Sequence, residues 1–592
     1  MKRTLSKIRL LGLSLLKHPR AFFLFLKYMR SEEVFDIDTH LAMASDWLLK
    51  AQSVGHDDGY SRGFYLYKGW DKSYIETTGY IISTLLDVYA HTGERKYLDS
   101  ALHAGRWLLS VQKSNGAFTD IDNDIELVFD TGQVLYGLVA LYESNELEAS
   151  EKERYRQAIE AAGEWLCSVQ DTDGSWTTYG YQKIAHSYYS RVASILYKAG
   201  MVVQKEHFKV CASKHIDWVL SSQMENGFFD HLKFVPTQES FLHTMVYVLE
   251  GLYDYYQYTQ DEQVLNALLK NANRLNAINH ERDLLLCSQY DSDFHCVNPE
   301  RCMTGLAQWA ALAFRLFALT EDEVYLKNAR KTLYYLRSKQ FKEGKDLNGA
   351  LPGSVPFWGE YAPYSAVNWG VKFYVDALLE SQPYPLSLID ESTLWIGECF
   401  RFSSHVVNHD FSATSQEYLK FLEPYIAQAK KVLDLGCGEG KYIRYFKEKF
   451  EEKKIYGVDP YFFDNETVKQ GDAYTIPFDQ TFDLIYTIEV LQHVKYLDDA
   501  LKEIGEHLAK EGRLIVCDRD PRSPIGYAKP IYEFRGKWMY PLDSPFVEKW
   551  YTLKTWKKIL EKNGFEIERT YTFTSPSNWK NRYSIIVTRK KR

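Results

Sequence analysis

Residues 434–440, Asp-Leu-Gly-Cys-Gly-Glu-Gly, form a glycine-rich segment directly after the short apolar run of residues 431–433. A helical pattern begins immediately afterwards, at Lys441. Glycine has no Cβ atom, so the backbone of a strand-to-helix turn of this kind can approach a ligand closely. The segment therefore predicts a turn that binds a nucleotide-like small molecule.

Acidic residues follow this turn at positions that suit such a ligand. Asp459 ends the next apolar run, about 20 residues beyond the turn, where a carboxylate can hold a pair of ribose hydroxyls. Asp472 and Ala473 precede a polar loop, and Glu489 lies one helical turn before His493. Together these residues predict a single binding site for that ligand.

The elements that must position these residues alternate between strand and helix patterns. Residues 454–459 are predicted to be a strand, and residues 482–494 a strand that runs into a helix. A helix over 501–508 and a strand over 512–517 complete the pattern. Such alternation predicts an α/β domain with a mostly parallel sheet.

At these residues the chain resembles the class I S-adenosylmethionine-dependent methyltransferases, and among them the ubiquinone and menaquinone biosynthesis type. The segment lacks the G-x-G-x-x-G phosphate pattern of dinucleotide binders, and this cofactor has no phosphate. The resemblance implies that the glycines wrap the methionine part, that Asp459 holds the ribose, and that Asp472 holds the adenine amine beside Ala473. The implied cofactor-binding set is Asp434, Gly436, Gly438, Gly440, Asp459, Asp472, Ala473 and Glu489.

Methyl transfer to a sugar hydroxyl would also require a base, because that proton has a high pKa. His493 is the candidate, and the alternative is a histidine that caps or packs a helix. Asp518 and Arg519 follow the last predicted strand, where residues of an open sheet line the ligand crevice. We expect them to contact the acceptor; the alternative is a solvated charge cluster. Residues 521–541 are a candidate substrate lid.

A repeat of about 53 to 61 residues occupies the first 380 residues. The pattern Trp-Leu-x-x-x-Gln begins at Trp47, Trp107 and Trp165, and related copies begin at Trp218, Arg274 and Tyr335. A more apolar helical pattern follows each copy, starting near residues 76, 130, 187, 241, 302 and 365. Six helical hairpins of this kind predict a closed double ring with the apolar helices inside.

This repeat resembles the (α/α)6 toroid of six-hairpin glycosidases, uronate lyases and sugar epimerases, and also terpenoid cyclase and prenyltransferase repeats. Residues 349–370 resemble toroids associated with bacterial surface polysaccharide synthesis. A toroid has a funnel where its inner helices begin, and acids, histidine and arginine there would suit an anionic sugar. The candidate catalytic residues are Glu76, Asp130, His186, His243 and Arg301, and the candidate substrate contacts are Trp358, Glu360 and Asn368. For each residue the alternative is a helix cap or buried ion pair.

The composition excludes some classes of function. A formal net charge of −8 argues against a general nucleic-acid binder. The eight cysteines have no framework spacing, which predicts reduced thiols in a cytosolic protein. Cys287, His295, Cys296 and Cys302 fit no zinc pattern, so we expect no metal site.

The first 34 residues are basic and apolar, with eight Lys or Arg residues before the first acid at Glu32. Neither apolar run is long enough to span a bilayer. Such a segment suits an anionic leaflet, so we expect peripheral attachment to the cytoplasmic face of the membrane. The alternative is a helix packed on the neighbouring domain.

The sequence thus predicts four parts: a membrane-surface segment (1–34), a toroid (35–382), a linker (383–410) and a methyltransferase domain (411–592). We expect O-methylation of a cell-surface polysaccharide or its lipid-linked precursor, with a toroid that binds or processes the same glycan as a lyase, hydrolase or epimerase. The alternatives are a non-catalytic glycan-binding toroid and an isoprenoid cyclase with a tailoring methyltransferase. The oligomeric state is not indicated.

Overall fold

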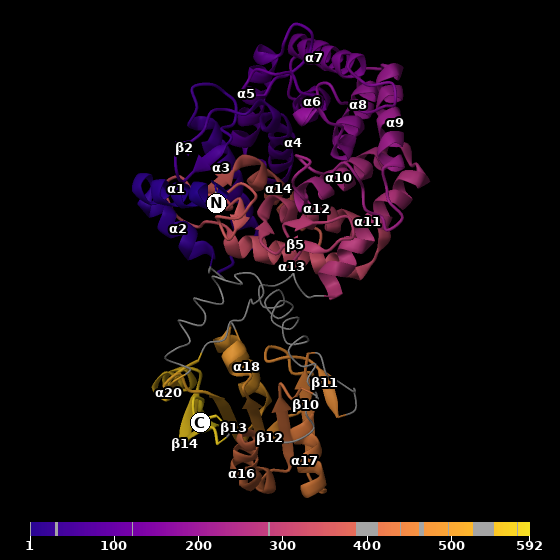
Figure 1. Ribbon diagram of the computed structural model, residues 1–592. Helices are drawn as coiled ribbons and strands as arrows, with labels where there is room; N and C mark the ends of the chain where they lie inside the picture. Colours follow the sequence, from indigo (N-terminus) through magenta and orange to yellow (C-terminus); the bar gives the residue numbers. More distant parts are fainter. Residues whose placement is uncertain are drawn as a thin grey trace. The chain divides into compact units, whose positions relative to one another are not determined.

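The structure is a computed structural model of the 592-residue chain, and it divides into two compact units, residues 1–385 and 386–592 (Figure 1). The residues described are 2–29, 33–120, 122–281, 285–385, 412–438, 440–460, 467–494, 496–524, 550–576 and 578–591. The predicted linker lies almost wholly outside these ranges, as does most of the predicted lid. Each unit is described by itself.

The N-terminal unit is a double ring of helices, here called the toroid. Its inner helices are α4 (Ile75–Thr92), α6 (Val128–Glu143), α8 (Ser190–Val202), α10 (Leu242–Thr259), α12 (Met303–Thr320) and α14 (Asn368–Glu380). Its outer helices are α3 (Ile37–Ser53), α5 (Arg95–Val111), α7 (Ala149–Ser168), α9 (Glu206–Ser221), α11 (Glu262–Glu281) and α13 (Glu323–Lys339). Each inner helix packs on the next, and α14 packs on α4, so the ring closes. The predicted toroid is confirmed.

The glutamine of the repeat explains why the pattern recurs. The side-chain amide of Gln170 donates to the carbonyl of Gly174 in its own turn and to the carbonyl of Cys211 on the next outer helix. Gln112 and Gln223 make the same pair of bonds in their repeats. Gln340 bonds Gly349 and reaches His40 on the first outer helix. In these four repeats one glutamine side chain therefore ties neighbouring hairpins together.

Short strands close the ring at the end where the inner helices begin. β1 (Gly63–Tyr65) pairs with β2 (Gly69–Trp70) and with β8 (Ser365–Val367), which joins the first repeat to the last. Two further small sheets are formed by β3 (Ser240–Phe241), β4 (Gln289–Tyr290) and β5 (Cys296–Asn298), and by β6 (Arg301–Cys302) with β7 (Ser354–Val355). These strands fix the loops around the funnel.

Two of the cysteines contradict the prediction of reduced thiols. Cys287 and Cys296 form a disulfide that spans the β4–β5 hairpin. The prediction was wrong because the hairpin brings together two residues whose spacing in sequence matched no framework pattern. Among the described residues, the free cysteines are Cys167, Cys211, Cys302, Cys437 and Cys517.

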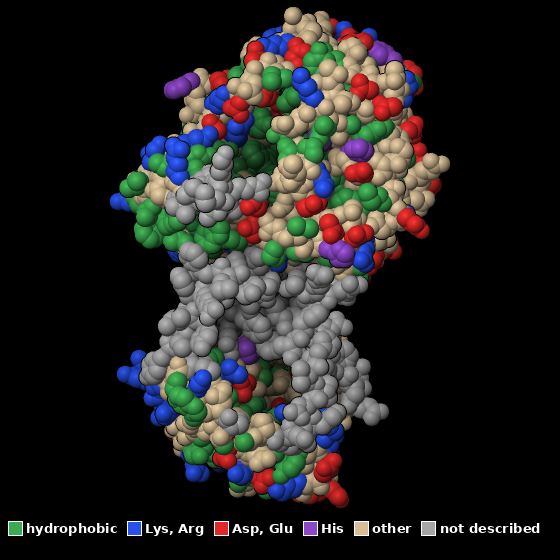
Figure 2. Space-filling view, viewed as in Figure 1, with side chains coloured by type: hydrophobic (Ala, Val, Ile, Leu, Met, Phe, Trp, Pro, Cys, Tyr) green, Lys and Arg blue, Asp and Glu red, His purple; other side chains and the backbone are tan. Residues whose placement is uncertain are grey.

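The N-terminal helices α1 (Lys2–Lys17) and α2 (Pro19–Met29) belong to the toroid unit. Phe25 is buried against Phe341 and Phe357, so α2 packs on the toroid, as the alternative interpretation expected. Leu16 and Phe23 remain exposed. Hydrophobic and basic side chains gather in Figure 2 where Figure 1 draws these two helices. None of the described helices is both long enough and apolar enough to cross a membrane.

The C-terminal unit is a seven-stranded sheet in the order β11-β10-β9-β12-β13-β15-β14. Its strands are β9 (Lys431–Leu435), β10 (Lys454–Asp459), β11 (Val468–Gln470), β12 (Phe482–Ile488), β13 (Leu508–Arg519), β14 (Phe565–Thr574) and β15 (Arg582–Lys590). The first five pair in parallel, and β15 pairs antiparallel with β13 and β14. The predicted α/β fold is confirmed.

Helices cover both faces of this sheet and bury its apolar side chains. α16 (Ala413–Gln428) and α17 (Lys441–Lys449) pack on one face, and α18 (Leu497–His507) and α20 (Leu553–Lys562) on the other. The helix predicted directly after β12 is only a short 3₁₀ turn, Leu491–His493. Glu489 explains this, because its φ of 58° is left-handed and stops a helix from continuing from the strand.

Candidate functional site

The glycine segment of the C-terminal unit forms the predicted strand-to-helix turn. Gly436, Gly438 and Gly440 all have φ between 51° and 78°, a conformation that glycine adopts without steric cost. A Cβ atom on Gly436 would lie 2.4 Å from Val490, whereas one on Gly438 would meet no atom within 4 Å. The turn thus needs glycine for its shape and leaves open space beside Gly438.

Carboxylates stand at the same edge of the sheet because the carboxyl ends of parallel strands meet there. Asp434 is on β9 and Asp459 ends β10, whereas Glu489 follows β12 and Asp518 lies near the end of β13. The backbone N–H of Gly438 donates to Asp459 Oδ2 at 2.8 Å. The structure therefore places these four acids at the carboxyl edge of the sheet, and their role in cofactor binding stays a prediction.

Asp434 is an acid at this edge of the sheet with a strongly raised pKa. It is buried, and Tyr486 donates its hydroxyl to Asp434 Oδ2 at 2.9 Å. Burial, together with the nearby charge of Asp459, raises the pKa of Asp434 to about 7, against the hydrogen bond from Tyr486. A carboxyl held near neutrality can ionise when a cation such as a sulfonium enters the crevice.

Other predicted residues of the crevice have defined local roles. Asp472 accepts from the backbone N–H groups of Tyr474 and Thr475, so it shapes the loop that carries Ala473. Glu489 forms an ion pair with Arg519 at 2.9 Å. A cofactor with a cationic centre, two ribose hydroxyls and an adenine matches carboxylates beside an open glycine turn, so S-adenosylmethionine fits the residues present.

The candidate base His493 is half-buried in the 3₁₀ turn after β12. Its neighbour Gln492 lies 3.1 Å from His493 Nε2 and also accepts from the backbone N–H of Arg519. The turn therefore places His493 and Arg519 together at the carboxyl ends of β12 and β13. Its role as a base stays a prediction.

The toroid contains a cavity of about 550 Å³ at the end where the inner helices begin. Four of the predicted residues line it: Glu76, Asp130, His243 and Glu360. Aromatic side chains form much of the remaining wall: Tyr65, Tyr74, Tyr80, Phe129, Tyr181, Tyr188, Phe234, Phe241, Tyr247, Tyr361 and Trp369. A cavity with aromatic faces and a few charged groups suits a sugar ligand.

The other predicted toroid residues lie outside the wall of this cavity. His186 is buried beneath it and its Nε2 lies 2.9 Å from the carbonyl of Tyr181. Arg301 donates to the carbonyl of Pro299, and Asn368 donates to Ser61 and Thr77 across the ring closure. Trp358 packs on Phe357. These contacts connect the side chains to the loops around the cavity.

Two buried carboxyl groups in the cavity have raised pKa values. Burial raises the pKa of Glu76 to about 6, against the hydrogen bond that Tyr74 donates to it at 2.5 Å. Burial and the charge of Glu76 both raise the pKa of Asp130. Asp130 Oδ2 has no hydrogen-bond partner among the described residues. The pair can therefore hold one proton and one negative charge near neutral pH.

Arg62 is a cavity residue that the sequence did not single out. It lies in the loop before β1, its guanidinium stacks on Tyr74 at 4.6 Å, and it pairs with Asp122 at 2.9 Å. Asp122 belongs to an acid-rich loop, and its ion pair holds Arg62 in place. Nothing in the local sequence distinguishes Arg62 from other surface arginines.

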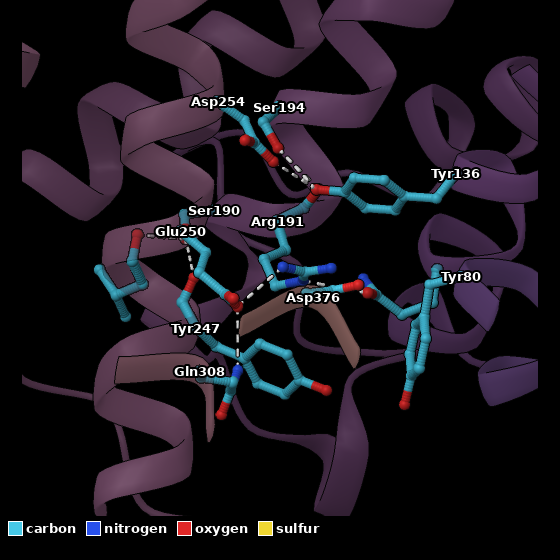
Figure 3. Close-up of polar contacts among 12 residues, drawn as sticks. Tyr80, Tyr136, Ser190, Arg191, Ser194, Tyr247, Glu250, Asp254, Gln308 and Asp376 are labelled. Atoms are coloured by element: carbon cyan, nitrogen blue, oxygen red, sulfur yellow. Dashed lines mark hydrogen bonds and ion pairs between the residues drawn. The ribbon is translucent and has the colours of Figure 1, made fainter. Parts of the chain in front are cut away.

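A buried polar network lies beside the cavity along the inner ring (Figure 3). Arg191 donates to Glu250 at 2.8 Å, and the side-chain amide of Gln308 donates to the same carboxylate oxygen at 2.9 Å. Gln308 in turn lies 2.6 Å from His243 Nδ1. Arg191 is buried and does not line the cavity.

Comparisons with known proteins agree with both units. Residues 407–570 match the family model "Methyltransferase domain", and residues 41–274 match "Ulvan lyase N-terminal domain". (S)-coclaurine N-methyltransferase of Thalictrum flavum is 27% identical over 157 residues, 23% of this chain and 43% of the relative. An uncharacterized methyltransferase of Staphylococcus carnosus is 27% identical over 173 residues, 27% of this chain and 83% of the relative. The chain thus spans less than half the length of the first of these relatives.

Solved structures resemble each unit separately. A heparin-specific unsaturated glucuronyl hydrolase is 17% identical and covers 60% of this chain and 98% of its own, with a TM-score of 0.47. A 1,6-didemethyltoxoflavin-N1-methyltransferase of Burkholderia thailandensis is 18% identical and covers 35% and 92%, with a TM-score of 0.27. By its family match the C-terminal unit contains an S-adenosylmethionine-dependent methyltransferase domain, and the toroid contains the segment that matches the ulvan lyase N-terminal domain.

Proposed function

We propose that this chain is a bifunctional enzyme that O-methylates an acidic cell-surface polysaccharide or its lipid-linked precursor. The toroid binds and processes the same glycan. The single observation that carries the proposal is the toroid cavity, where Glu76 and Asp130 share a buried, aromatic-walled site with Arg62. That cavity lies in the same chain as a methyltransferase domain.

An anionic sugar is the ligand class that this cavity suits. Arg62 offers a guanidinium that can hold a uronate carboxylate in a forked pair. Glu76, Asp130 and His243 all lie in the first turn of an inner helix, so three helix N-termini also direct their positive ends toward the cavity. Phe234 and Tyr361 supply apolar faces for a sugar ring.

The acid pair supports cleavage of a glycosidic bond by proton transfer. Asp130, whose pKa is raised, supplies the proton donor, and Glu76 accepts a proton once it ionises. A lyase, a hydrolase or an epimerase activity would each require such a pair of proton donor and acceptor, and hydrolysis uses it most directly. The charged groups on the wall speak against an isoprenoid cyclase, whose cavity would be lined by aromatic and aliphatic side chains.

In the methyltransferase domain, bound S-adenosylmethionine supplies an activated methyl group. The chain's own residues orient the two reactants, because positioning accounts for much of the rate in methyl transfer. His493 is the proposed acceptor of the sugar hydroxyl proton, and Asp518 and Arg519 are the proposed contacts of the acceptor sugar. Their place beside the ends of β12 and β13 supports these roles.

Attachment to the cytoplasmic face of the membrane would bring this enzyme to a lipid-linked substrate. Leu11, Leu15, Leu16 and Phe23 are exposed on α1 and α2, and Lys17 and Arg20 are exposed between them. Exposed apolar side chains flanked by basic ones favour an anionic leaflet. Removal of residues 1–29 should release the protein from anionic vesicles, and persistent co-sedimentation would reject this part of the proposal.

The experiment that tests the proposal incubates the full chain with methyl-labelled S-adenosylmethionine and a panel of uronate-containing oligosaccharides. We expect label on a sugar oxygen and shortened oligosaccharides. Label on a terpenoid or on protein alone would reject the proposal. Methylation of intact oligosaccharides that bind the toroid without being cleaved would instead identify the toroid as a glycan-binding platform.

A further inference from the structure

His243 is held by a chain of hydrogen bonds whose direction is fixed at its far end. Arg191 and Glu250 form a buried ion pair at 2.8 Å. Burial raises the pKa of Glu250 and the charge of Arg191 opposes that rise, so the carboxylate paired with the guanidinium accepts hydrogen bonds. The side-chain amide of Gln308 therefore points its N–H at Glu250, 2.9 Å away. The opposite atom of that amide, Oε1, faces His243.

This direction determines which nitrogen of His243 carries the proton. Gln308 Oε1 can only accept, so His243 Nδ1, 2.6 Å away, must donate. Burial lowers the pKa of His243 to about 3, so the ring is neutral and carries a single proton. Nε2 is therefore an acceptor with a lone pair.

The ring of His243 belongs to the cavity wall. His243 lines the cavity, and its ring packs between Tyr247 at 4.3 Å and Tyr361 at 5.3 Å. In the part of the chain that the structure describes, no group donates a hydrogen bond to Nε2. A ligand in the cavity must supply that donor or leave a polar atom unsatisfied.

We propose that His243 Nε2 recognises one free hydroxyl of the sugar in the toroid and discriminates against a methyl ether at the same position. The inference rests on the proposed glycan function and specifies its substrate. A hydroxyl donates to Nε2, whereas a methoxy group cannot donate and adds bulk. The toroid therefore acts on the glycan before this hydroxyl is methylated, and a methyl group there protects the glycan from the toroid.

The same network argues that His243 is an acceptor for binding rather than a proton-abstracting base. A base with a pKa far below the working pH takes up a proton poorly. Gln308 is accordingly a positioning residue, because it fixes the protonation pattern of His243 without lining the cavity.

The test uses the full chain labelled with ¹⁵N in its histidines, with the His243 resonances assigned by their loss in His243→Gln. We expect a protonated Nδ1 and an unprotonated Nε2 in the wild type. In Gln308→Met the acceptor is gone, so we expect the proton to distribute between the two nitrogens. Gln223→Met, which removes a glutamine that bonds Gly227 and Ala267 and not His243, should leave the His243 resonances unchanged. Protonation of Nε2 in the wild type would overturn the inference whatever the ligand.

Binding is then measured with one uronate disaccharide and its monodeoxy and mono-O-methyl derivatives. At one position, both changes should weaken binding by about tenfold or more, because both remove the donor to Nε2. Gln308→Met should shrink this ratio, since its His243 can present a donor. Equal binding of all derivatives would overturn the inference and keep the proposed function. Failure of every disaccharide to bind would reject the proposed function itself.

Discussion

The two candidate sites both rest on buried acids with raised pKa values, but they are built in different ways. Asp434, Asp459 and the glycine turn lie within 26 residues, at the ends of two adjacent strands. The toroid cavity takes Arg62, Glu76, Asp130, His243 and Tyr361 from loops and helices spread over about 300 residues. The glycine-turn site is specified by neighbouring residues in sequence, whereas the toroid cavity depends on closure of the ring. Substitutions at the two sites should therefore have different effects.

The largest effect is expected at the acid pair of the toroid. Asp130→Asn should lower glycan cleavage by about 100-fold to 10,000-fold, because it removes a proton donor from the reacting site. Methyl transfer measured in parallel should stay within about twofold of the wild type. Asp99→Asn, an exposed acid on α5, is the matched control for both activities. Unchanged cleavage in Asp130→Asn would exclude catalysis by this pair.

A comparable loss, here of cofactor binding by the methyltransferase domain, should follow from the addition of a single methyl group. Gly436→Ala places a Cβ atom 2.4 Å from Val490 at a φ of 78°, so the turn must shift. We expect S-adenosylmethionine binding, measured by calorimetry, to weaken by roughly 100-fold.

Gly564→Ala separates strain from contact, because it has a similar φ of 83° and open space around the new atom. This control should lose only about 1 kcal/mol of stability and keep cofactor affinity. Equal cofactor binding by Gly436→Ala and the wild type would show that the turn does not shape the cofactor site.

A smaller effect is expected in the pH dependence of stability. Because the folded pKa of Asp434 is raised to about 7 from 3.8, the folded state holds this proton more tightly than the unfolded chain. The stability contributed by the protonated form is therefore lost as pH rises from about 4 to 7. Asp434→Asn should flatten that loss, by roughly 1–3 kcal/mol.

Calorimetry of the full chain tests this prediction. The unfolding transition that shifts when S-adenosylmethionine is added belongs to the methyltransferase domain, and its pH dependence is the quantity to measure. Asp434→Asn should also bind the cofactor more weakly. An unchanged pH dependence in the variant would place the titrating group elsewhere.

The smallest effect concerns the glutamine ties of the toroid. Gln170→Ala removes two hydrogen bonds to backbone carbonyls and should lower the stability of the toroid transition by about 1–2 kcal/mol. The methyltransferase transition should not move. Ser110→Ala, which removes a bond within one helix, is a milder control. A shift of both transitions would contradict independent behaviour of the two units.

The same contrast explains what could be predicted from the sequence. The glycine turn and Asp459 are close in sequence and have a characteristic spacing. The C-terminal fold and the position of these residues could therefore be predicted from local sequence patterns. The repeat predicted the ring and the start of each inner helix to within a few residues, and so placed Glu76, Asp130 and His243. Arg62 was missed, since its position depends on a loop that folds over the funnel rather than on the repeat.

The residues placed outside the cavity have a related explanation. His186, Arg301 and Asn368 also lie near the start of inner helices, but loop contacts take up their side chains. The repeat pattern predicts which residues lie at the funnel end of the toroid. It does not predict where the side chain of each residue points. The disulfide between Cys287 and Cys296 was likewise hidden, because a β-hairpin and not a spacing pattern brings the two residues together.

The central claim is that both units act on one acidic glycan. Mass spectrometry of a single uronate-containing oligosaccharide, incubated with the full chain and methyl-labelled S-adenosylmethionine, tests it most directly. The account predicts products of the same oligosaccharide that are shortened and products that carry label on a sugar oxygen. An oligosaccharide that is neither cleaved nor labelled, while the protein still binds S-adenosylmethionine, would contradict it.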